Sequence, residues 1–237
     1  LSIRCAIIGC GSADRRQSIA RVIATDTAEV LCDLIFSALA QAVPETALAP
    51  CTGRALLTIS GVDPRSGRYY VYNESMGGGE GAHMTQDGAT AVQTAVSNSR
   101  NVPVEVVEFE YPLQVVRYEL AEDSGGAGHW RGGLGYRREV RVIGHRARAV
   151  VGGNYLRIAS WGLDGGMAGA RGRRDYSAGV EPFVNARGFL EPGQSVAITT
   201  SGGGGVGDPR TRDRARIAQD VREGRVSEAA AREVYGL

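Results

Sequence analysis

The stretch from residue 74 to residue 88 gathers residue types that could perform acid–base chemistry. Glu80, His83 and Asp87 lie close together among glycines. A carboxylate can orient a base or bind a cation, and glycines let backbone N–H groups approach a ligand. The block therefore predicts a catalytic Asp87 and a substrate-binding set comprising Gly77, Gly78, Gly79 and His83. A surface turn would explain the same glycines equally well.

A second polar block, SNSRNVPVE over residues 97–105, follows closely. Asparagine amides and an arginine side chain suit recognition of amide and carboxylate groups. We assign Asn98 to catalysis, and we assign Arg100, Asn101 and Glu105 to substrate binding. The competing interpretation is that the asparagines adopt turn conformations ahead of Pro103.

Two further glycine runs carry weaker signals. Residues 202–207 match a G-x-G-x-x-G pattern, but Asp208 would place negative charge where a pyrophosphate sits. A tight turn before a terminal helix is the favoured interpretation. In the run over residues 123–135, Asp123 and Arg131 are expected to form a structural pair.

The elements that must position these blocks can be read from periodicity. Residues 26–43 predict a helix with a capping box formed by Asp26 and Glu29, and its apolar stripe is expected to face the core. Hairpins are expected over residues 55–73 and 136–151, and strands over 104–110, 113–120 and 196–200. Residues 210–223 and a final segment capped by Ser227 predict helices. The glycines between strands predict turns.

These elements predict an α+β fold. Its β-rich middle, mixed or antiparallel, lies between helices at the N- and C-terminal ends. We divide the chain into an N-terminal segment with an amphipathic helix (1–50), a glycine-rich β-dominated core (51–209) and C-terminal helices (210–237).

Composition excludes several kinds of chemistry. The chain has 237 residues and a formal net charge of +1, which gives no electrostatic reason to expect nucleic acid or a membrane as partner. The 27 basic residues are all arginine, so a Walker lysine and a Schiff-base lysine are absent. The four cysteines and three histidines match no zinc spacing, and we expect no metal site built from this chain alone. The start of the chain lacks the pattern of a signal peptide, which predicts a cytoplasmic protein.

The ordered blocks together resemble a known family. NES-x-GGG-x-GA, SN-x-RN-x-PVE, YPL-x-V-x-RYEL, DSGGAG-x-x-RGG-x-G, WGL-x-GG and GGGG-x-GDP run from Asn73 to Pro209. Their order is similar to that of the B-type subunit of ATP-dependent hydantoinases and 5-oxoprolinases, to which acetone-carboxylase-type α-subunits are related. Here the resemblance is to the C-terminal portion only.

The resemblance implies an ATP-dependent hydrolase that opens a small cyclic amide, such as a hydantoin or 5-oxoproline. In such enzymes ATP and Mg²⁺ are held by an A-type subunit, which activates the substrate carbonyl. The B-type subunit completes the active site. The partners implied are therefore the N-terminal half of the B-type chain and an A-type subunit, and this chain alone is expected to bind no cofactor.

Two departures from the family pattern affect these expectations. The N-terminal half of family members, rich in histidine and aspartate, is absent from the sequence. Gln93 and Ala95 stand in a segment that often carries histidine in the family, and neither can act as an imidazole base. The alternatives are a non-catalytic assembly fragment of a split or truncated enzyme, and a subunit of an ATP-dependent ketone carboxylase.

Overall fold

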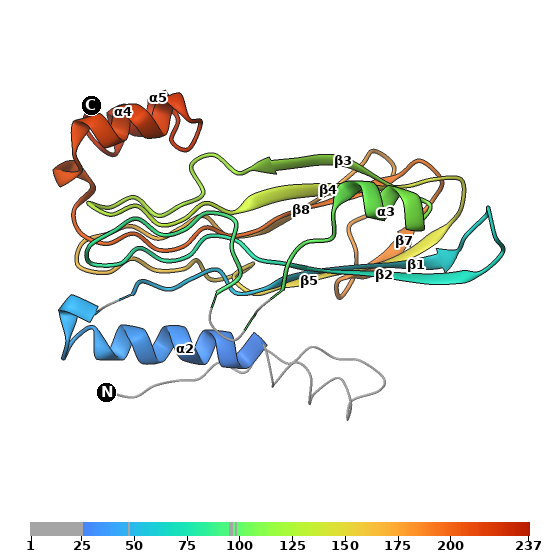
Figure 1. Ribbon diagram of the computed structural model, residues 1–237, viewed down its shortest axis with the longest axis horizontal. Coiled ribbons are helices and arrows are strands. Elements are labelled where there is room, and N and C mark those ends of the chain that lie inside the picture. Colours follow the sequence, from blue (N-terminus) through green and yellow to red (C-terminus); the bar gives the residue numbers. More distant parts are fainter. Residues whose placement is uncertain (1–25, 47, 95–96, 98) are drawn as a thin grey trace.

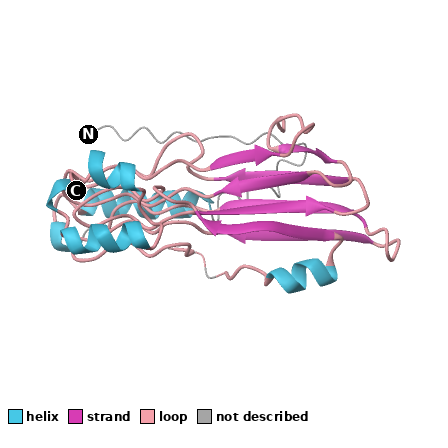
Figure 2. Cartoon of the chain, turned by 90° about the horizontal axis from the view of Figure 1, so that it is seen from above, coloured by secondary structure: helices cyan, strands magenta, loops and turns pink. Residues whose placement is uncertain are grey.

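A computed structural model describes residues 26–46, 48–94, 97 and 99–237. Within this part of the chain the strands form two four-stranded antiparallel sheets, in the orders β2-β1-β5-β7 and β3-β4-β8-β6. The first sheet comprises β1 (Ala55–Val62), β2 (Tyr69–Met76), β5 (Ala147–Gly153) and β7 (Arg187–Leu190). The second comprises β3 (Leu113–Leu120), β4 (Tyr136–Val142), β6 (Arg173–Tyr176) and β8 (Ser195–Thr199). Figures 1 and 2 show the strands at one end of the molecule and most of the helices at the other.

The two sheets face each other across one hydrophobic core. Ile59 and Tyr72 of the first sheet belong to the same buried cluster as Val140 and Ile198 of the second. Strands β2 and β4 bury alternate residues, as strands with one face on a core do. The predicted α+β fold with an antiparallel middle is therefore confirmed.

Helices lie at both ends of the described part of the chain, as expected. Near its start lie α2 (Asp26–Leu39) and a short 3-10 helix (Pro44–Thr46). Near its end lie a 3-10 turn (Pro209–Thr211), α4 (Arg214–Arg222) and α5 (Glu228–Glu233). Ser227 caps α5 through a bond from the Ala230 N–H, which confirms the predicted cap. No helix in the described ranges is both long and apolar enough to cross a bilayer.

The strand expected over residues 104–110 is wrong, because this segment forms helix α3 (Val104–Glu110). Its alternation of valine and glutamate fits either structure over so short a run. Arg65, in the β1–β2 turn, donates to the carbonyls of Phe109 and Glu110 at 3.1 Å each. These bonds, from a residue outside the segment, satisfy carbonyl groups that a helix leaves unpaired at its C-terminal end.

The hairpin expected over residues 136–151 is also wrong, whereas the hairpin of β1 and β2 is confirmed. Strand β4 pairs with β3 and β8, while β5 pairs with β1 and β7. The connection at Gly144 therefore crosses from one sheet to the other. Strands β4 and β5 therefore belong to different sheets. Their buried faces meet across the core, and the two strands are not neighbours within one sheet.

Beyond the strand ends, glycine-rich segments pack into what we call the glycine bundle. It contains residues 48–53, 77–82, 88–92, 124–135, 160–170 and 201–207, seen as wavy coils on the left of Figure 1. Successive N–H groups of the central segment donate to different neighbours: Gly202 to Ala170 (3.1 Å), Gly203 to Gly133 (3.0 Å), Gly204 to Pro50 (2.9 Å), Gly205 to Met167 (2.9 Å) and Val206 to Trp130 (2.9 Å). Every third N–H of the central segment thus donates to the same neighbouring segment. This periodicity is that of a polyproline II helix and not of a strand.

Glycine is required in this bundle because backbones touch where side chains would stand. A Cβ at Gly203 would overlap the Glu80 carbonyl, and one at Gly79 would overlap the Gly133 carbonyl. The central segment is therefore a buried, extended element, and the expectation of a tight turn over residues 202–207 is wrong. The glycines cluster in the sequence mainly because backbones pack closely in the bundle. Turns, which the sequence predicted, explain only part of the clustering.

Candidate functional site

Asp87 holds the C-terminal helices against the glycine bundle. Its carboxylate accepts two bonds from Arg212, at 2.7 and 2.8 Å, and one from the Arg131 N–H at 2.7 Å. Burial alone would raise the pKa of Asp87, but the hydrogen bonds and charge of Arg212 outweigh it and lower that pKa below its ordinary value. Asp87 is thus an anion with its acceptor positions engaged, so its catalytic role remains a prediction that these contacts do not favour.

Asp220 of α4 completes this network. It accepts from Arg212 at 2.7 Å and lies 3.4 Å from Nε of Arg131, and all three side chains are buried. Asp123 bonds instead to the Ser227 N–H at 2.8 Å. The expected pair of Asp123 with Arg131 is therefore wrong, because each residue takes its partner from the C-terminal helical segment. We call Asp87, Arg131, Arg212 and Asp220 the arginine clamp.

The predicted glycines lie within the bundle with their backbone groups engaged. Gly78 exchanges two hydrogen bonds with Val92, at 2.9 and 2.8 Å, and the Gly79 N–H donates to the Ser201 carbonyl at 3.1 Å. A Cβ at Gly77 would overlap the Val92 carbonyl. Substrate binding by Gly77, Gly78 and Gly79 stays a prediction, and these contacts give them a packing role.

The second predicted block contributes to a buried network between the sheets. Glu74 accepts from Asn101 at 2.6 Å and from the Val102 N–H at 3.1 Å, and it lies 3.7 Å from the guanidinium of Arg138. Asn101 also accepts from Tyr136 at 3.1 Å. Arg100 and Glu105 are exposed, and Asn98 lies outside the described residues. The structure therefore brings Asn101 to a core network, and it does not bring Arg100 and Glu105, the other described members of this block, to the same place.

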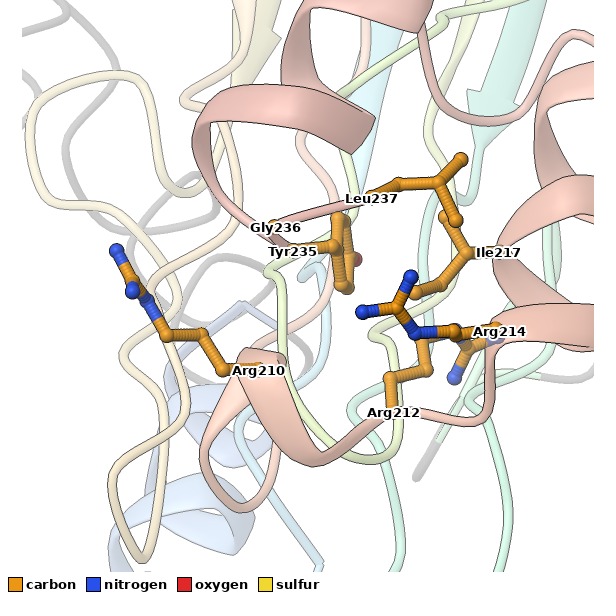
Figure 3. Close-up of a pocket in the computed structure, with 7 residues that line it drawn as sticks. All are labelled: Arg210, Arg212, Arg214, Ile217, Tyr235, Gly236 and Leu237. Carbon is orange, nitrogen blue, oxygen red and sulfur yellow. The ribbon is translucent and has the colours of Figure 1, made fainter.

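A cavity near the C-terminal helices is a poor candidate for a site. It has a volume of about 200 Å³ and is lined by Arg210, Arg212, Arg214, Ile217, Tyr235, Gly236 and Leu237. Figure 3 shows that Arg210 directs its guanidinium away from the other side chains. Arg212 belongs to the arginine clamp. The arginines therefore do not converge on a common anion position.

A larger cavity, of about 410 Å³, lies between α2 and the glycine bundle. Its lining combines carboxylates, a thiol, an amide and apolar side chains, from Asp33, Phe36, Leu48, Cys51, Glu80, Ala89, Val92, Gln93 and Thr94. Its volume falls in the range of small-molecule sites, roughly 300–1,000 Å³. We call it the α2 cavity.

Glu80 lines the α2 cavity, and its carboxylate is oriented by contacts to both oxygens. Its Oε2 accepts from the Ala89 N–H at 3.0 Å, while its Oε1 lies 3.7 Å from Nε2 of His83. The backbone of His83 pairs with Leu48, which also lines the cavity. Carboxylates and imidazoles are the side chains most often used to transfer protons in catalysis, and here the two lie 3.7 Å apart.

Asp33 and Cys51 form the inner wall of the same cavity. Asp33 accepts from the Cys51 N–H at 3.0 Å and from the Tyr155 hydroxyl. Burial raises the pKa of Asp33 to about 6, although both bonds act in the opposite direction. Burial also raises the pKa of the Cys51 thiol to about 12, so the thiol stays neutral and is no nucleophile at neutral pH.

The raised pKa of Asp33 predicts a pH-dependent stability. Folding favours the protonated carboxyl, so this contribution is fully present below the unfolded value of 3.8 and is lost as the pH rises through about 6. We expect the contribution of Asp33 to the unfolding free energy to fall by about 3 kcal/mol over this window. Urea unfolding at a series of pH values measures it. Asp33→Asn should lack this decrease, and an unchanged pH profile in the variant would contradict the assignment.

The sequence presents Glu80 and Asp87 as alternative carboxylates of one block and predicts the catalytic role for Asp87, whereas Asp33 was not predicted as a site residue. The available signal for Asp33 was its spacing of four from Glu29, which puts two acidic side chains on one face of α2. In the described part of the chain, no group of three or more histidine, cysteine, aspartate or glutamate side chains could hold a metal ion.

Comparison with known proteins shows the family to which the chain belongs. The model of the Hydantoinase B/oxoprolinase family matches residues 12–209. The B-type subunit of a putative D-/L-hydantoinase from Pseudomonas sp. (strain NS671) is 31% identical over 218 residues, covering 90% of this chain and 36% of that protein. The caprolactamase β-subunit of Pseudomonas jessenii is 35% identical over 233 residues, covering 90% of this chain and 39% of that protein.

Solved structures agree in fold. The crystal structure of ATP-dependent caprolactamase from Pseudomonas jessenii superposes with a TM-score of 0.69 at 31% identity, covering 84% of this chain and 37% of that one. Nucleotide-free acetone carboxylase gives a TM-score of 0.62 at 24% identity, covering 79% and 30%. The chain therefore spans less than two fifths of each of these relatives.

Proposed function

The chain belongs to the hydantoinase B/oxoprolinase family, and on this premise we propose that it supplies the α2 cavity to the active site of an ATP-dependent cyclic amidohydrolase. The observation that carries the proposal is Glu80, held by one oxygen on the bundle and facing the cavity beside His83. A hydantoin, 5-oxoproline or other lactam is small enough for a cavity of about 410 Å³.

The reaction proposed is hydrolysis of the ring amide. Water adds to the carbonyl carbon, the C–N bond breaks, and the ring nitrogen takes up a proton. Glu80 accepts the proton of the attacking water, and His83 relays it. The lining of Phe36, Leu48 and Val92 offers an apolar surface to the ring methylenes.

ATP and Mg²⁺ belong, in this proposal, to an A-type partner. The relatives support that division, because two of them are named as subunits of larger enzymes and the caprolactamase structure is described as ATP-dependent. The remainder of a B-type chain is the second partner, since the relatives extend well beyond the part that this chain matches.

Glu80→Gln tests the assignment. The chain is co-expressed with the remainder of a B-type chain and with an A-type subunit, and ATP-coupled hydrolysis of hydantoin, 5-oxoproline and caprolactam is assayed. We expect kcat to fall by about 10²–10⁴-fold, the usual contribution of a general base, with the melting temperature unchanged. Glu119→Gln, at an exposed position of β3, is the matched control.

Full activity in Glu80→Gln would overturn the role of Glu80. Asp87→Asn separates the two candidate carboxylates, because loss of kcat without loss of stability in this variant would restore Asp87 as the catalytic residue. Product that forms only with added bicarbonate would identify a carboxylase instead of a hydrolase.

A further inference from the structure

Helix α2 packs on the protein through its polar side. Glu29 accepts from the Arg54 N–H at 3.0 Å, Asp33 accepts from the Cys51 N–H at 3.0 Å, and Ser37 accepts from the Trp161 indole at 3.1 Å. These residues are four apart, so they form one face of the helix. Glu29 also accepts from the Asn154 amide at 3.2 Å. The side chain of Asp26 lies outside the described residues, so the expected capping box of Asp26 and Glu29 stays a prediction.

The apolar stripe of α2 faces away from the protein. Leu31 is 53% exposed, Ile35 48% and Leu39 48%, and Phe36 and Val43 are also exposed. The expectation that this stripe packs in the core is therefore wrong. Figure 1 shows α2 as a separate rod along the lower side of the molecule, opposite α4 and α5. A helix on a protein surface normally turns its apolar face inward, so an outward stripe of this kind marks an interaction surface.

We propose that the outer stripe of α2, comprising Leu31, Ile35, Phe36 and Leu39, docks the remainder of a B-type chain. The length of the relatives supports this occupant: the chain spans 36% of the hydantoinase relative and 39% of the caprolactamase relative, so in each the larger part lies elsewhere. The outer stripe carries no charged side chain, which fits an apolar surface of that remainder and not an acidic or basic partner.

Phe36 connects the outer stripe with the α2 cavity. Phe36 belongs to the outer stripe and also lines the cavity, beside Asp33. A polypeptide seated on the stripe therefore reaches the cavity rim at Phe36, where it closes the open side and adds its own residues. The inference rests on the proposed function and deepens it by naming the surface through which the shared site is assembled.

A binding experiment without substrate or ATP tests the surface. The chain is co-expressed with the tagged portion of the caprolactamase β-subunit that lies outside its match to this chain, and co-purification is quantified by native mass spectrometry. We expect a one-to-one complex with the wild type. Leu31→Glu combined with Ile35→Glu should weaken binding about a hundredfold, as loss of two central interface residues does. Phe109→Glu, on an apolar residue of α3 that is 78% exposed, is the matched control.

Circular dichroism and thermal melting establish that each variant is folded. Leu31→Ala combined with Ile35→Ala, which keeps good helix formers, provides a second variant if the glutamates disturb α2. Equal co-purification of wild type and stripe variants would overturn the proposal, as would an absent wild-type complex. A dimer of the chain alone that the stripe variants abolish would identify a second copy as the occupant and would overturn it too. Because the readout is binding, a fully active Glu80→Gln variant that still forms the complex would refute only the proposed function.

Discussion

Replacing Gly203 with alanine is expected to prevent the chain from reaching its folded state. The new Cβ would overlap the Glu80 carbonyl, and the Gly203 N–H already donates to the Gly133 carbonyl at 3.0 Å. Neither neighbour is a side chain that could rotate away, so the segments of the bundle would have to separate and lose their mutual hydrogen bonds. A cost of about 4 kcal/mol or more follows, which is a large fraction of the stability of a typical domain.

Gly152→Ala is the matched control for this prediction. Gly152 lies in β5 with an ordinary backbone conformation, and the nearest atom to its added Cβ is Leu56 Cβ at 4.0 Å. Soluble yield and the midpoint of urea unfolding measure both variants. We expect the control to remain close to the wild type and Gly203→Ala to be insoluble or unfolded. A Gly203→Ala variant with a wild-type midpoint would show that the bundle tolerates a side chain at its centre.

Removing Asp220 is expected to release the C-terminal helices. Asp220→Ala leaves the buried guanidinium of Arg131 without its carboxylate partner and takes one of two carboxylates from Arg212. A buried charge that has lost its partner costs about 3–5 kcal/mol. Because α4 and α5 are attached through this clamp, we expect them to become sensitive to protease while the two sheets stay folded.

Limited proteolysis followed by mass spectrometry distinguishes local release from global unfolding. Glu228→Ala is the control, because Glu228 pairs with Arg232 on the surface, where both side chains are well exposed and such pairs contribute at most about 1 kcal/mol. Protection of residues 212–237 in Asp220→Ala at the wild-type level would contradict the structural role of the clamp.

Short-range features of the fold were predictable from the sequence. The cap at Ser227 and the β1–β2 hairpin depend on residues a few positions apart, and both are confirmed. Helix α3 was missed because the contacts at its C-terminal end come from Arg65, which is 44 or 45 positions distant. The family resemblance rested on the order of whole blocks and is confirmed by the family match.

The candidate site was harder to predict for a physical reason. Asp87, within a glycine block, has the sequence appearance of a catalytic carboxylate, but its partner Arg212 lies 125 positions away. Asp33 has the appearance of a solvated helix position, yet it lies inside a cavity wall. The stripe of α2 was assigned to the core because periodicity identifies an apolar face without identifying what covers it.

The glycine bundle also constrains when the protein can fold during synthesis. Its central segment, residues 201–207, is the last of the bundle to leave the ribosome, and its N–H groups supply bonds to segments made much earlier, at Pro50, Gly133 and Ala170. Until that segment emerges, those segments lack the N–H donors that it supplies in the folded protein. Co-translational folding can therefore form the β1–β2 hairpin early, but the glycine layer must close in one late event that draws together segments from both halves of the chain.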